Sequence, residues 1–331
     1  MKRILNILFE HKTLNRQTAK EVLVNIGKGI YNEHEITAFM TVFLMRSITL
    51  QELQGFQDAL LDLCFRMHFE GINTIDIVGT GGDGKNTFNI STLSCFIVAG
   101  TGHKVTKHGN YGASTISGAS NVMQMLGYKF KNNNEELLKE LELANICFMH
   151  APLFHPALKN VAAIRKNLGI RTFFNMLGPL VNPALPSFSI IGVYNLEMAR
   201  LYNYLMQQTP DRFAIVHALD GYDEISLTGD TKIITREGEK IYSAIELGGM
   251  EIKPESITGG ESVEDATRIF TNILMGKGTR EQEAVVLANA ATALNVTGRY
   301  RSYEESFAAA KESLQSGKAF DSLQKLIALQ S

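Results

Sequence analysis

The residues with the most chemical potential in this sequence form a glycine-rich stretch, residues 79–87, that reads Gly-Thr-Gly-Gly-Asp-Gly-Lys-Asn-Thr. A short apolar segment at 75–78 precedes it and is typical of a strand, and the segment 91–98 after it is typical of a helix. Glycine lets backbone N–H groups turn toward an anion without obstruction from Cβ, and the N-terminus of the next helix adds positive potential. The stretch therefore predicts an anion-binding loop, with a tight exposed turn as the plainer alternative.

The loop has the glycine spacing of a dinucleotide-binding fingerprint at Gly79, Gly81 and Gly84. That motif also needs a helix that opens at the loop and an acidic residue at the end of the second strand, where it accepts a hydrogen bond from a ribose hydroxyl. Here residues 85–89 intervene before the helix, and the second strand ends in a Lys-His pair. The dinucleotide hypothesis therefore fails on its structural context.

Residues 79–85 also fit a nucleotide-binding P-loop up to its final position. Asn86 stands where a serine or threonine would ligate magnesium, and Thr87 comes one residue too late for that role. A P-loop that binds ATP through Lys85 stays as an alternative, and a failure to bind ATP would exclude it.

The elements that must position this loop fall into two regions with different hydrophobic periods. Up to about residue 65, apolar residues recur at three- and four-residue spacing only, which predicts a small helical domain, and Thr49 with Glu52 predicts a capping box there. From residue 75 onward, strands alternate with helices, as in α/β proteins with a mainly parallel central sheet flanked by helices. We expect the helical domain at 1–68, joined by part of 165–185, and the α/β domain at 69–331. The predicted helices cover 13–26, 32–46, 49–64, 91–98, 134–144, 156–167, 196–207, 263–275 and 280–294, and a further helix with a final short one lies within 303–329. The predicted strands cover 75–78, 104–106, 146–149, 189–193 and 213–217, and a hairpin covers 231–241.

Composition narrows the classes of partner. The chain carries 32 Lys and Arg against 34 Asp and Glu, a formal net charge of −2, so no electrostatic excess favours nucleic acid or an anionic membrane surface. No apolar run is long enough to span a bilayer, and the N-terminus is better interpreted as a short amphipathic helix than as a signal peptide. The three cysteines lie far apart in apolar stretches, which favours buried thiols in a reducing cytosol over disulfides or zinc.

A longer series of motifs extends the glycine loop. The first five residues of the loop, followed by Asn-Ile-Ser-Thr at 89–92 and Lys-His-Gly-Asn at 107–110, closely resemble the anthranilate phosphoribosyltransferase family. The resemblance continues in the family's order and covers essentially the whole chain, so it is far more specific than a single glycine loop. Its further motifs are residues 165–175, 178–180, 182–183, 220–224, 259–260 and 289–291.

The resemblance implies a fold similar to nucleoside phosphorylases and phosphoribosyltransferases, and a defined reaction. The phosphoribosyl group of 5-phosphoribosyl 1-pyrophosphate would pass to the amine of anthranilate, with Mg²⁺ as cofactor, in tryptophan biosynthesis. A cytoplasmic homodimer formed through the helical domain is also implied. The residues implied for 5-phosphoribosyl 1-pyrophosphate are Gly79, Gly82, Asp83, Thr87, Asn89, Ile90, Ser91, Thr92, Lys107, Ser114, Thr115 and Ala119. Those implied for anthranilate are Gly79, His108, Asn110 and Arg165, and those implied for the metal are Ser91, Asp223 and Glu224.

The residue types at these positions suit the chemistry. Breaking the bond between C1 and pyrophosphate builds negative charge on the leaving group, and Mg²⁺ held by Asp223 and Glu224 would stabilise it. The planar guanidinium of Arg165 can fix the carboxylate of anthranilate, and Asn110 resembles the residue that contacts the amine. An aryl amine already has a free lone pair, so no residue is assigned as acid or base. Catalysis is then expected to rest on positioning and charge stabilisation.

Each of these assignments has a plainer structural alternative. Adjacent acidic residues are most often a surface pair, Arg165 could be an exposed helix residue, and Asn89 and Ser91 could simply cap a helix. Capping and phosphate binding are compatible, so the last alternative competes weakly.

The sequence departs from the family pattern in one segment. Tyr111 follows Lys-His-Gly-Asn where the family usually has arginine, and Ala119 stands where a hydroxyl is expected near the substrate phosphates. Four nearby hydroxyl residues are candidates to compensate for it, and the departure bears on substrate affinity more than on reaction class. These candidates are Ser114, Thr115, Ser117 and Ser120.

Two other functions compete with the transferase. A nucleoside phosphorylase of the same fold would split nucleosides with phosphate and would not need the acidic pair at 223–224; the matches at Asn110 and Arg165 argue against it. A non-catalytic relative that binds nucleic acid should show a basic excess, which this chain lacks.

Overall fold

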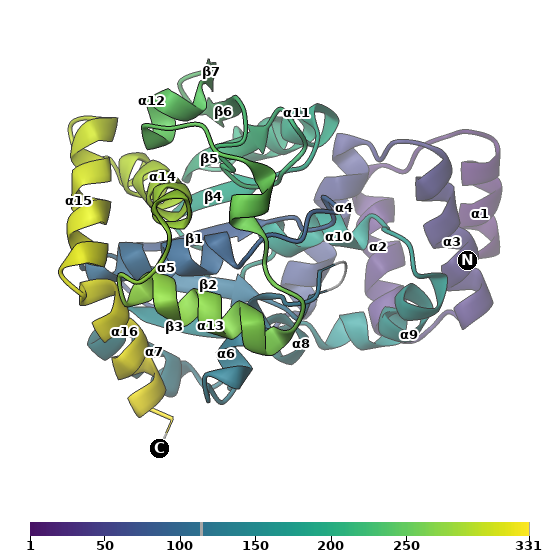
Figure 1. Cartoon of the computed structure of the whole chain (residues 1–331). Helices are drawn as coiled ribbons and strands as arrows, with labels where there is room; N and C mark the ends of the chain where they lie inside the picture. The colour runs from purple at the N-terminus through teal and green to yellow at the C-terminus, as the bar shows by residue number, and fades with distance from the viewer. Residues whose placement is uncertain (113–114, 331) are drawn as a thin grey trace. The chain divides into compact units, whose positions relative to one another are not determined.

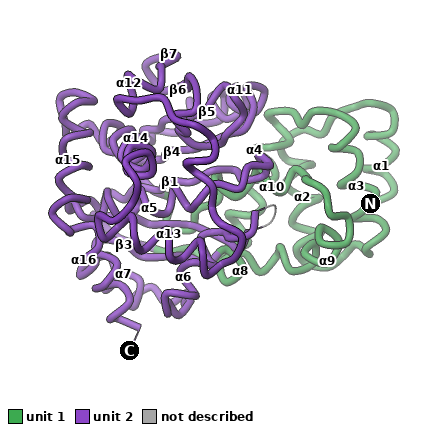
Figure 2. Tube along the Cα trace, in the orientation of Figure 1, with its two compact units in different colours: residues 1–67, 151–185 green, residues 68–150, 186–331 purple. Residues whose placement is uncertain are grey.

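The computed structural model of the chain describes residues 1–112 and 115–330. The chain folds into two compact units, coloured separately in Figure 2. Unit 1 contains residues 1–67 and 151–185, and unit 2 contains residues 68–150 and 186–331. Figure 1 shows the helices and strands of each unit.

Unit 2 is built on one seven-stranded sheet with the order β3-β2-β1-β4-β5-β6-β7. The first five strands in this order are parallel, whereas β6 and β7 form an antiparallel hairpin at one side, as the sequence predicted. The predicted α/β class with a mainly parallel sheet is therefore confirmed. The strands are β1 (Thr74–Gly79), β2 (Lys104–Gly109), β3 (Ile146–His150), β4 (Phe188–Gly192), β5 (Arg212–Ala218), β6 (Thr231–Thr235) and β7 (Glu239–Tyr242).

Helices cover this sheet and enclose its core. The helix α5 (Ile90–Gly100), which follows the glycine loop, is buried along almost its whole length and packs against α14 (Arg280–Thr297), as well as against β1 and β2. Burial on all sides explains why this helix is apolar all round instead of amphipathic. Among the described residues, no helix combines the length and the apolar character needed to cross a membrane. The other helices of unit 2 are α6 (Ala119–Met125), α7 (Asn134–Ala144), α11 (Leu196–Met206), α12 (Ala244–Gly248), η3 (Pro254–Ile257), α13 (Val263–Leu274), α15 (Tyr303–Gln315) and α16 (Lys318–Ala328).

Unit 1, all of whose residues are described, is helical. The helices predicted from apolar spacing at 13–26, 32–46 and 49–64 are present with shifts of a few residues at their ends, and the one expected at 156–167 begins as a 3₁₀ turn. An aromatic cluster of Phe39, Phe43, Phe56 and Phe173 joins the N-terminal helices to the returning segment, with Phe56 and Phe173 stacked at 4.6 Å between ring centroids. The helices are α1 (Lys2–Phe9), α2 (Arg16–Gly27), α3 (Glu33–Met45), α4 (Leu50–Leu63), α8 (Ala151–Phe154), η1 (Pro156–Leu158), α9 (Lys159–Leu168), α10 (Phe174–Leu177) and η2 (Gly178–Leu180).

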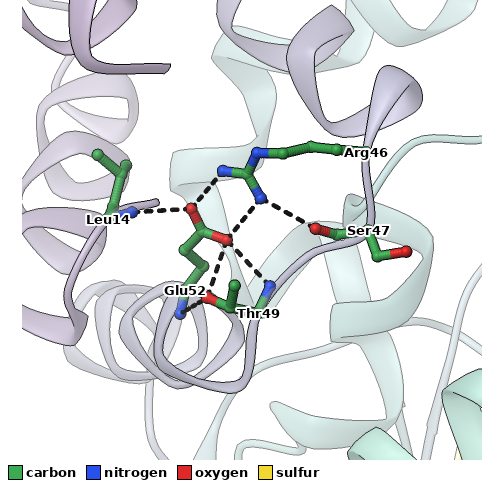
Figure 3. Close-up of polar contacts among 5 residues, drawn as sticks. All are labelled: Leu14, Arg46, Ser47, Thr49 and Glu52. Atoms are coloured by element: carbon green, nitrogen blue, oxygen red, sulfur yellow. Dashed lines mark hydrogen bonds and ion pairs between the residues drawn. The ribbon is translucent and has the colours of Figure 1, made fainter. Parts of the chain in front are cut away.

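The predicted capping box at the start of α4 is present and belongs to a larger buried network (Figure 3). The Glu52 side chain is fully buried, and its carboxylate accepts hydrogen bonds from the backbone N–H groups of Leu14 and Thr49, at 2.9 Å each. The guanidinium of Arg46 donates both terminal nitrogens to the same carboxylate, at 2.5 and 2.9 Å. One carboxylate thus ties together the end of α3, the start of α4 and the segment before α2.

The charge of Glu52 depends on these donors. Burial by itself would raise the pKa of the Glu52 carboxyl, but the hydrogen bonds from Arg46, Leu14 and Thr49 lower it below its usual value. A carboxyl whose pKa is lower in the folded than in the unfolded chain adds stability above the unfolded pKa and loses it as the pH falls through the folded pKa. Glu52 therefore contributes to the acid sensitivity of unit 1.

We expect Glu52→Gln to lower the free energy of unfolding by about 3 kcal/mol, because it leaves the half-buried Arg46 guanidinium without its counter-charge. Glu10→Gln is the matched control, since the Glu10–Lys12 pair is exposed at both ends and should contribute less than about 1 kcal/mol. Urea denaturation followed by circular dichroism would measure both. Equal effects of the two substitutions would contradict a structural role for the buried network.

Candidate active site

Two glycines at the ends of neighbouring strands make room for the acidic pair. Gly79 ends β1 and lies opposite Gly192, which ends the parallel strand β4 (Figure 1). A Cβ on Gly79 would overlap the Asp223 carboxylate, and a Cβ on Gly192 would overlap the Asp223 backbone oxygen. Asp223 follows β5, the next strand in the sheet, so the acidic pair lies at the carboxyl edge of the sheet, the usual position of sites in α/β proteins.

The backbone amides that the sequence assigned to an anion donate to these carboxylates. The Gly81 N–H donates to Oδ2 of Asp223 at 2.6 Å, and the Ser91 N–H at the start of α5 donates to Oε1 of Glu224 at 2.9 Å. The structure therefore brings together the glycine loop, the helix N-terminus and the predicted metal residues. It also excludes the plain alternative for the acidic pair, because Asp223 is 7% exposed and its carboxylate binds the loop.

The carboxylates in this cluster repel one another. Burial and the neighbouring Asp83 charge raise the pKa of Asp223 to about 7. Burial and the Asp223 charge raise the pKa of Glu224 well above its usual value, and burial also raises the pKa of Asp83. A bound cation would relieve this repulsion.

The donor set at this cluster fits Mg²⁺. Carboxylate oxygens are the ligands that Mg²⁺ prefers, and it usually takes one or two of them together with substrate oxygens and water. Among the described residues, no group of three acidic, histidine or cysteine side chains forms a ready-made metal cage. Asp223 and Glu224 can supply the one or two carboxylates that Mg²⁺ takes alongside substrate oxygens.

The end of the glycine loop, residues 86–88, pairs through its backbone with a second segment, residues 257–259. The Gly259 N–H donates to the Asn86 carbonyl at 2.7 Å, Thr87 forms an isolated antiparallel bridge with Thr258, and the Phe88 N–H donates to the Ile257 carbonyl. Gly259, noted in the sequence only as a family match, is thereby explained, because a Cβ there would press against the Thr87 carbonyl. Thr87 thus lies in the anchored part of the loop.

The residues at the start of α5 differ in what they can offer a ligand. Asn89 is the N-cap, but its side chain makes no capping hydrogen bond; Nδ2 donates to the Ser117 carbonyl at 3.2 Å, and the buried Oδ1 has no partner among the described residues. The capping alternative for Asn89 is therefore wrong for its side chain. Ile90 and Thr92 are almost completely buried, so their side chains face the core.

Lys107, which the family resemblance implies for 5-phosphoribosyl 1-pyrophosphate, is buried between two strands. Its side chain is 2% exposed, and Nζ donates to the carbonyls of Ile77 and His108 at 2.8 and 3.2 Å. The ammonium thus lies between β1 and β2, and His108 is buried beside it. Lys107 can support an anion site through its charge, while its donors hold the two strand ends together.

Among the described residues after β2, Asn110 and Asn121 accept several backbone hydrogen bonds. The Asn110 side chain accepts from the Tyr111 N–H and its carbonyl accepts from the Ser120 N–H, while Asn121 Oδ1 accepts from two backbone amides. Ala119 begins α6, so its missing hydroxyl leaves the helix start intact.

The residues that could compensate for the hydroxyl missing at Ala119 differ in what their own hydroxyls contact. Ser120 is fully buried and its hydroxyl contacts His150 Nδ1 at 2.8 Å, so the expectation that Ser120 compensates is wrong. The Thr115 hydroxyl approaches the Ser117 carbonyl at 3.5 Å, whereas Ser114 lies outside the described residues.

Arg165 lies in unit 1, on α9, and every other described site residue lies in unit 2. Its guanidinium lies 5.5 Å from the centroid of the Phe174 ring and pairs with no carboxylate among the described residues. Burial lowers the pKa of Arg165, but a guanidinium stays charged at neutral pH. The plain alternative of an exposed helix arginine is wrong, because Arg165 is half-buried. A half-buried guanidinium that pairs with no carboxylate among the described residues is suited to bind one.

Sequence reasoning missed two residues of this site. Gly192 ends an apolar strand and gave no motif of its own; its importance follows only from its position opposite Gly79. Tyr222, whose ring is 4% exposed beside Asp223, appeared in the sequence only as part of a family motif. A glycine at the carboxyl end of a predicted strand was the available signal for the first of them.

The combination of these two units has counterparts among known proteins. Residues 71–320 match the α/β domain of the glycosyl transferase family, and residues 2–64 match the helical bundle domain of that family. A helical bundle and an α/β domain with a glycine-loop site thus define the chain as a protein of the glycosyl transferase class.

Individual relatives narrow the class further. Proteins of Christiangramia forsetii and Flavobacterium johnsoniae, each named anthranilate phosphoribosyltransferase, are 55% identical to the chain over 326 residues, which is 98% of each sequence. The anthranilate phosphoribosyltransferase structure from Thermus thermophilus has a TM-score of 0.91 at 28% identity and covers 98% of both chains. That from Saccharomyces cerevisiae, in complex with PRPP and Mg, has a TM-score of 0.91 at 27% identity over 98% of this chain and 96% of that one. The chain belongs to the anthranilate phosphoribosyltransferase family, as the motifs predicted.

We expect Gly192→Ala to lower the free energy of unfolding by about 2 kcal/mol, because the new Cβ overlaps the backbone that carries Asp223. Gly229→Ala is the matched control, since a Cβ there meets nothing closer than 3.9 Å. Denaturant unfolding of both variants would measure the difference. A Gly192→Ala protein as stable as the control would show that the close approach of Asp223 is not required.

Proposed function

We propose that the site in unit 2 binds 5-phosphoribosyl 1-pyrophosphate with Mg²⁺ and that this enzyme uses it to form N-(5-phosphoribosyl)anthranilate and pyrophosphate from anthranilate. The observation that carries the proposal is the convergence of the Gly81 and Ser91 amides with Asp223 and Glu224. The Saccharomyces cerevisiae relative in complex with PRPP and Mg supports it.

The anion-binding part of the reaction follows from the donors in unit 2. The Gly81 and Ser91 N–H groups bind carboxylate oxygens, so phosphate oxygens are acceptors that they could bind as well. Lys107 adds a positive charge between β1 and β2. Mg²⁺ bound near the acidic pair would neutralise charge that develops on the departing diphosphate.

The acceptor part of the reaction needs orientation more than proton transfer. The guanidinium of Arg165, which pairs with no carboxylate among the described residues, can take the carboxylate of anthranilate in a bidentate fashion. The lone pair of the aryl amine attacks C1 as the diphosphate leaves. No residue is assigned as a general base, and the rate depends on positioning and electrostatic stabilisation.

The proposal extends to the assembly. Large apolar side chains of α1 and α3 are exposed in unit 1: Phe9 is 61% and Met45 is 87% exposed. A second copy of the chain that packs on these helices would cover them, which fits a homodimer through the helical unit. We also propose that the enzyme works in the cytoplasm.

The first test is consumption of anthranilate, followed by its fluorescence. Wild-type protein with 5-phosphoribosyl 1-pyrophosphate and Mg²⁺ should consume it, and a chelator should stop the reaction. Asp223→Asn combined with Glu224→Gln should lower the rate at least about a hundredfold, because the metal loses its protein ligands. Glu239→Gln, a change of an exposed carboxylate on β7, is the control.

A wild-type protein that does not consume anthranilate but splits nucleosides with phosphate would instead be a nucleoside phosphorylase. Full activity in the doubly substituted protein would reject the metal role of the acidic pair.

Arg165→Lys tests the acceptor side. We expect the KM for anthranilate to rise about tenfold, because an ammonium cannot hold a carboxylate with two parallel hydrogen bonds. The KM for 5-phosphoribosyl 1-pyrophosphate should stay the same, as should both constants in the control Lys166→Gln, an exposed neighbour on α9. Steady-state kinetics with each substrate varied would separate these outcomes. An unchanged KM for anthranilate would remove Arg165 from the acceptor site.

A further inference from the structure

One contact at the glycine loop has no part in the function described so far. The ammonium of Lys85 lies over the ring of Tyr222, 4.5 Å from its centroid. This is within the range of a cation–π interaction, and the Tyr222 ring is 4% exposed while Lys85 is half-buried. Partial burial strengthens such a contact, because fewer water molecules compete with the ring for the ammonium.

The two partners stand next to the carboxylates of the site. Lys85 comes two residues after Asp83, and its backbone N–H donates to Asp83 Oδ1 at 3.0 Å. Tyr222 immediately precedes Asp223, whose carboxylate accepts from the Gly81 N–H. The cation–π contact therefore joins the glycine loop to the segment that carries the acidic pair, at the place where like charges push the two segments apart.

The glycine loop needs a stabilising contact on the side toward the acidic pair. Gly81, Gly82 and Gly84 all have positive φ, and none carries a side chain that packs, so the loop has much backbone freedom to lose on ordering. Its other side is held by backbone hydrogen bonds to Ile257 and Gly259, and the Asn86 side chain donates to the Gly260 carbonyl. Toward the acidic pair, the Gly81 amide and the Lys85 ammonium both hold the loop, beside the Asp83 carboxyl, which also hydrogen-bonds to Asp223.

The position of Lys85 also excludes the P-loop alternative. A P-loop lysine reaches the phosphates while the next residue ligates magnesium through a hydroxyl. Here the Lys85 ammonium lies on the Tyr222 ring, and the Asn86 side chain donates to the Gly260 carbonyl at 2.8 Å. Neither side chain is arranged as that motif requires.

We propose that Lys85 and Tyr222 form a clasp that positions the glycine loop against the acidic pair and thereby sets the affinity for the diphosphate substrate. The inference rests on the proposed function. Lys85 is a positioning residue in this account, since it acts through Tyr222 and the loop. Loss of the clasp weakens binding of 5-phosphoribosyl 1-pyrophosphate, leaves the KM for anthranilate unchanged, and has little effect on kcat because bound substrate restores the loop.

A double-substitution cycle on the full-length enzyme tests the clasp. Lys85→Gln removes the charge, and Tyr222→Leu removes the ring. We expect each to raise the KM for 5-phosphoribosyl 1-pyrophosphate about three- to tenfold, the range of a partly buried cation–π contact. The double variant should be no weaker than the single ones, because both remove the same contact. Lys85→Arg and Tyr222→Phe, which keep a cation and a ring, should restore values near wild type.

Calorimetric titration of each variant with 5-phosphoribosyl 1-pyrophosphate and Mg²⁺ should show the same order of affinities, independently of turnover. Thermal melting shows which variants are folded, and Lys85→Gln alone decides the case if Tyr222→Leu fails to fold. An unchanged substrate affinity in Lys85→Gln overturns the clasp, as does a weakening by Lys85→Gln that Lys85→Arg does not restore or that adds to the effect of Tyr222→Leu. Anthranilate consumption by wild-type enzyme keeps these outcomes separate from a failure of the proposed function.

Discussion

The site depends on one constraint: the Asp223 carboxylate lies close against the backbone at the ends of β1 and β4. No side chain fits at Gly79 or Gly192 while Asp223 occupies this place. The Gly81 N–H then binds the carboxylate and sets the course of the glycine loop, and the Ser91 N–H binds Glu224 and fixes the start of α5 against the same segment. Strand register, loop path and helix position thus meet at two adjacent acidic residues.

In this arrangement the Gly81 and Ser91 N–H groups could serve two kinds of acceptor, carboxylate oxygens and phosphate oxygens. The same N–H groups that hold the carboxylates point to the carboxyl edge of the sheet, where a phosphate would take up amide donors. A metal bound to the carboxylates would lower their value as hydrogen-bond acceptors and leave the amides to the substrate. In the proposed function, metal and diphosphate would then favour each other, because each would remove a charge or a donor that otherwise opposes the other.

The sequence predicted the regular elements well, because hydrophobic period and capping are local. The α/β class, the hairpin and the capping box of Thr49 with Glu52 all follow from such local signals. Local pattern could not predict contacts that depend on strand order, such as Gly192 opposite Gly79.

Side-chain direction was equally hidden in the sequence. Lys107 was expected among the residues for the substrate phosphates, but its ammonium donates to two strand carbonyls, and the Ser120 hydroxyl contacts His150. These outcomes depend on tertiary packing, which motif spacing does not encode. The family motifs nevertheless marked the residues that meet at the acidic pair, because the same reaction chemistry selects them.

The most direct test of this account is the behaviour of two backbone amides in solution. In ¹⁵N-labelled protein, the amide signals of Gly81 and Ser91 should shift when 5-phosphoribosyl 1-pyrophosphate and Mg²⁺ are added together, because their acceptors change from carboxylate to phosphate oxygens. Signals of both amides that stay in place at saturating substrate and metal would contradict the central claim that these donors form the anion site.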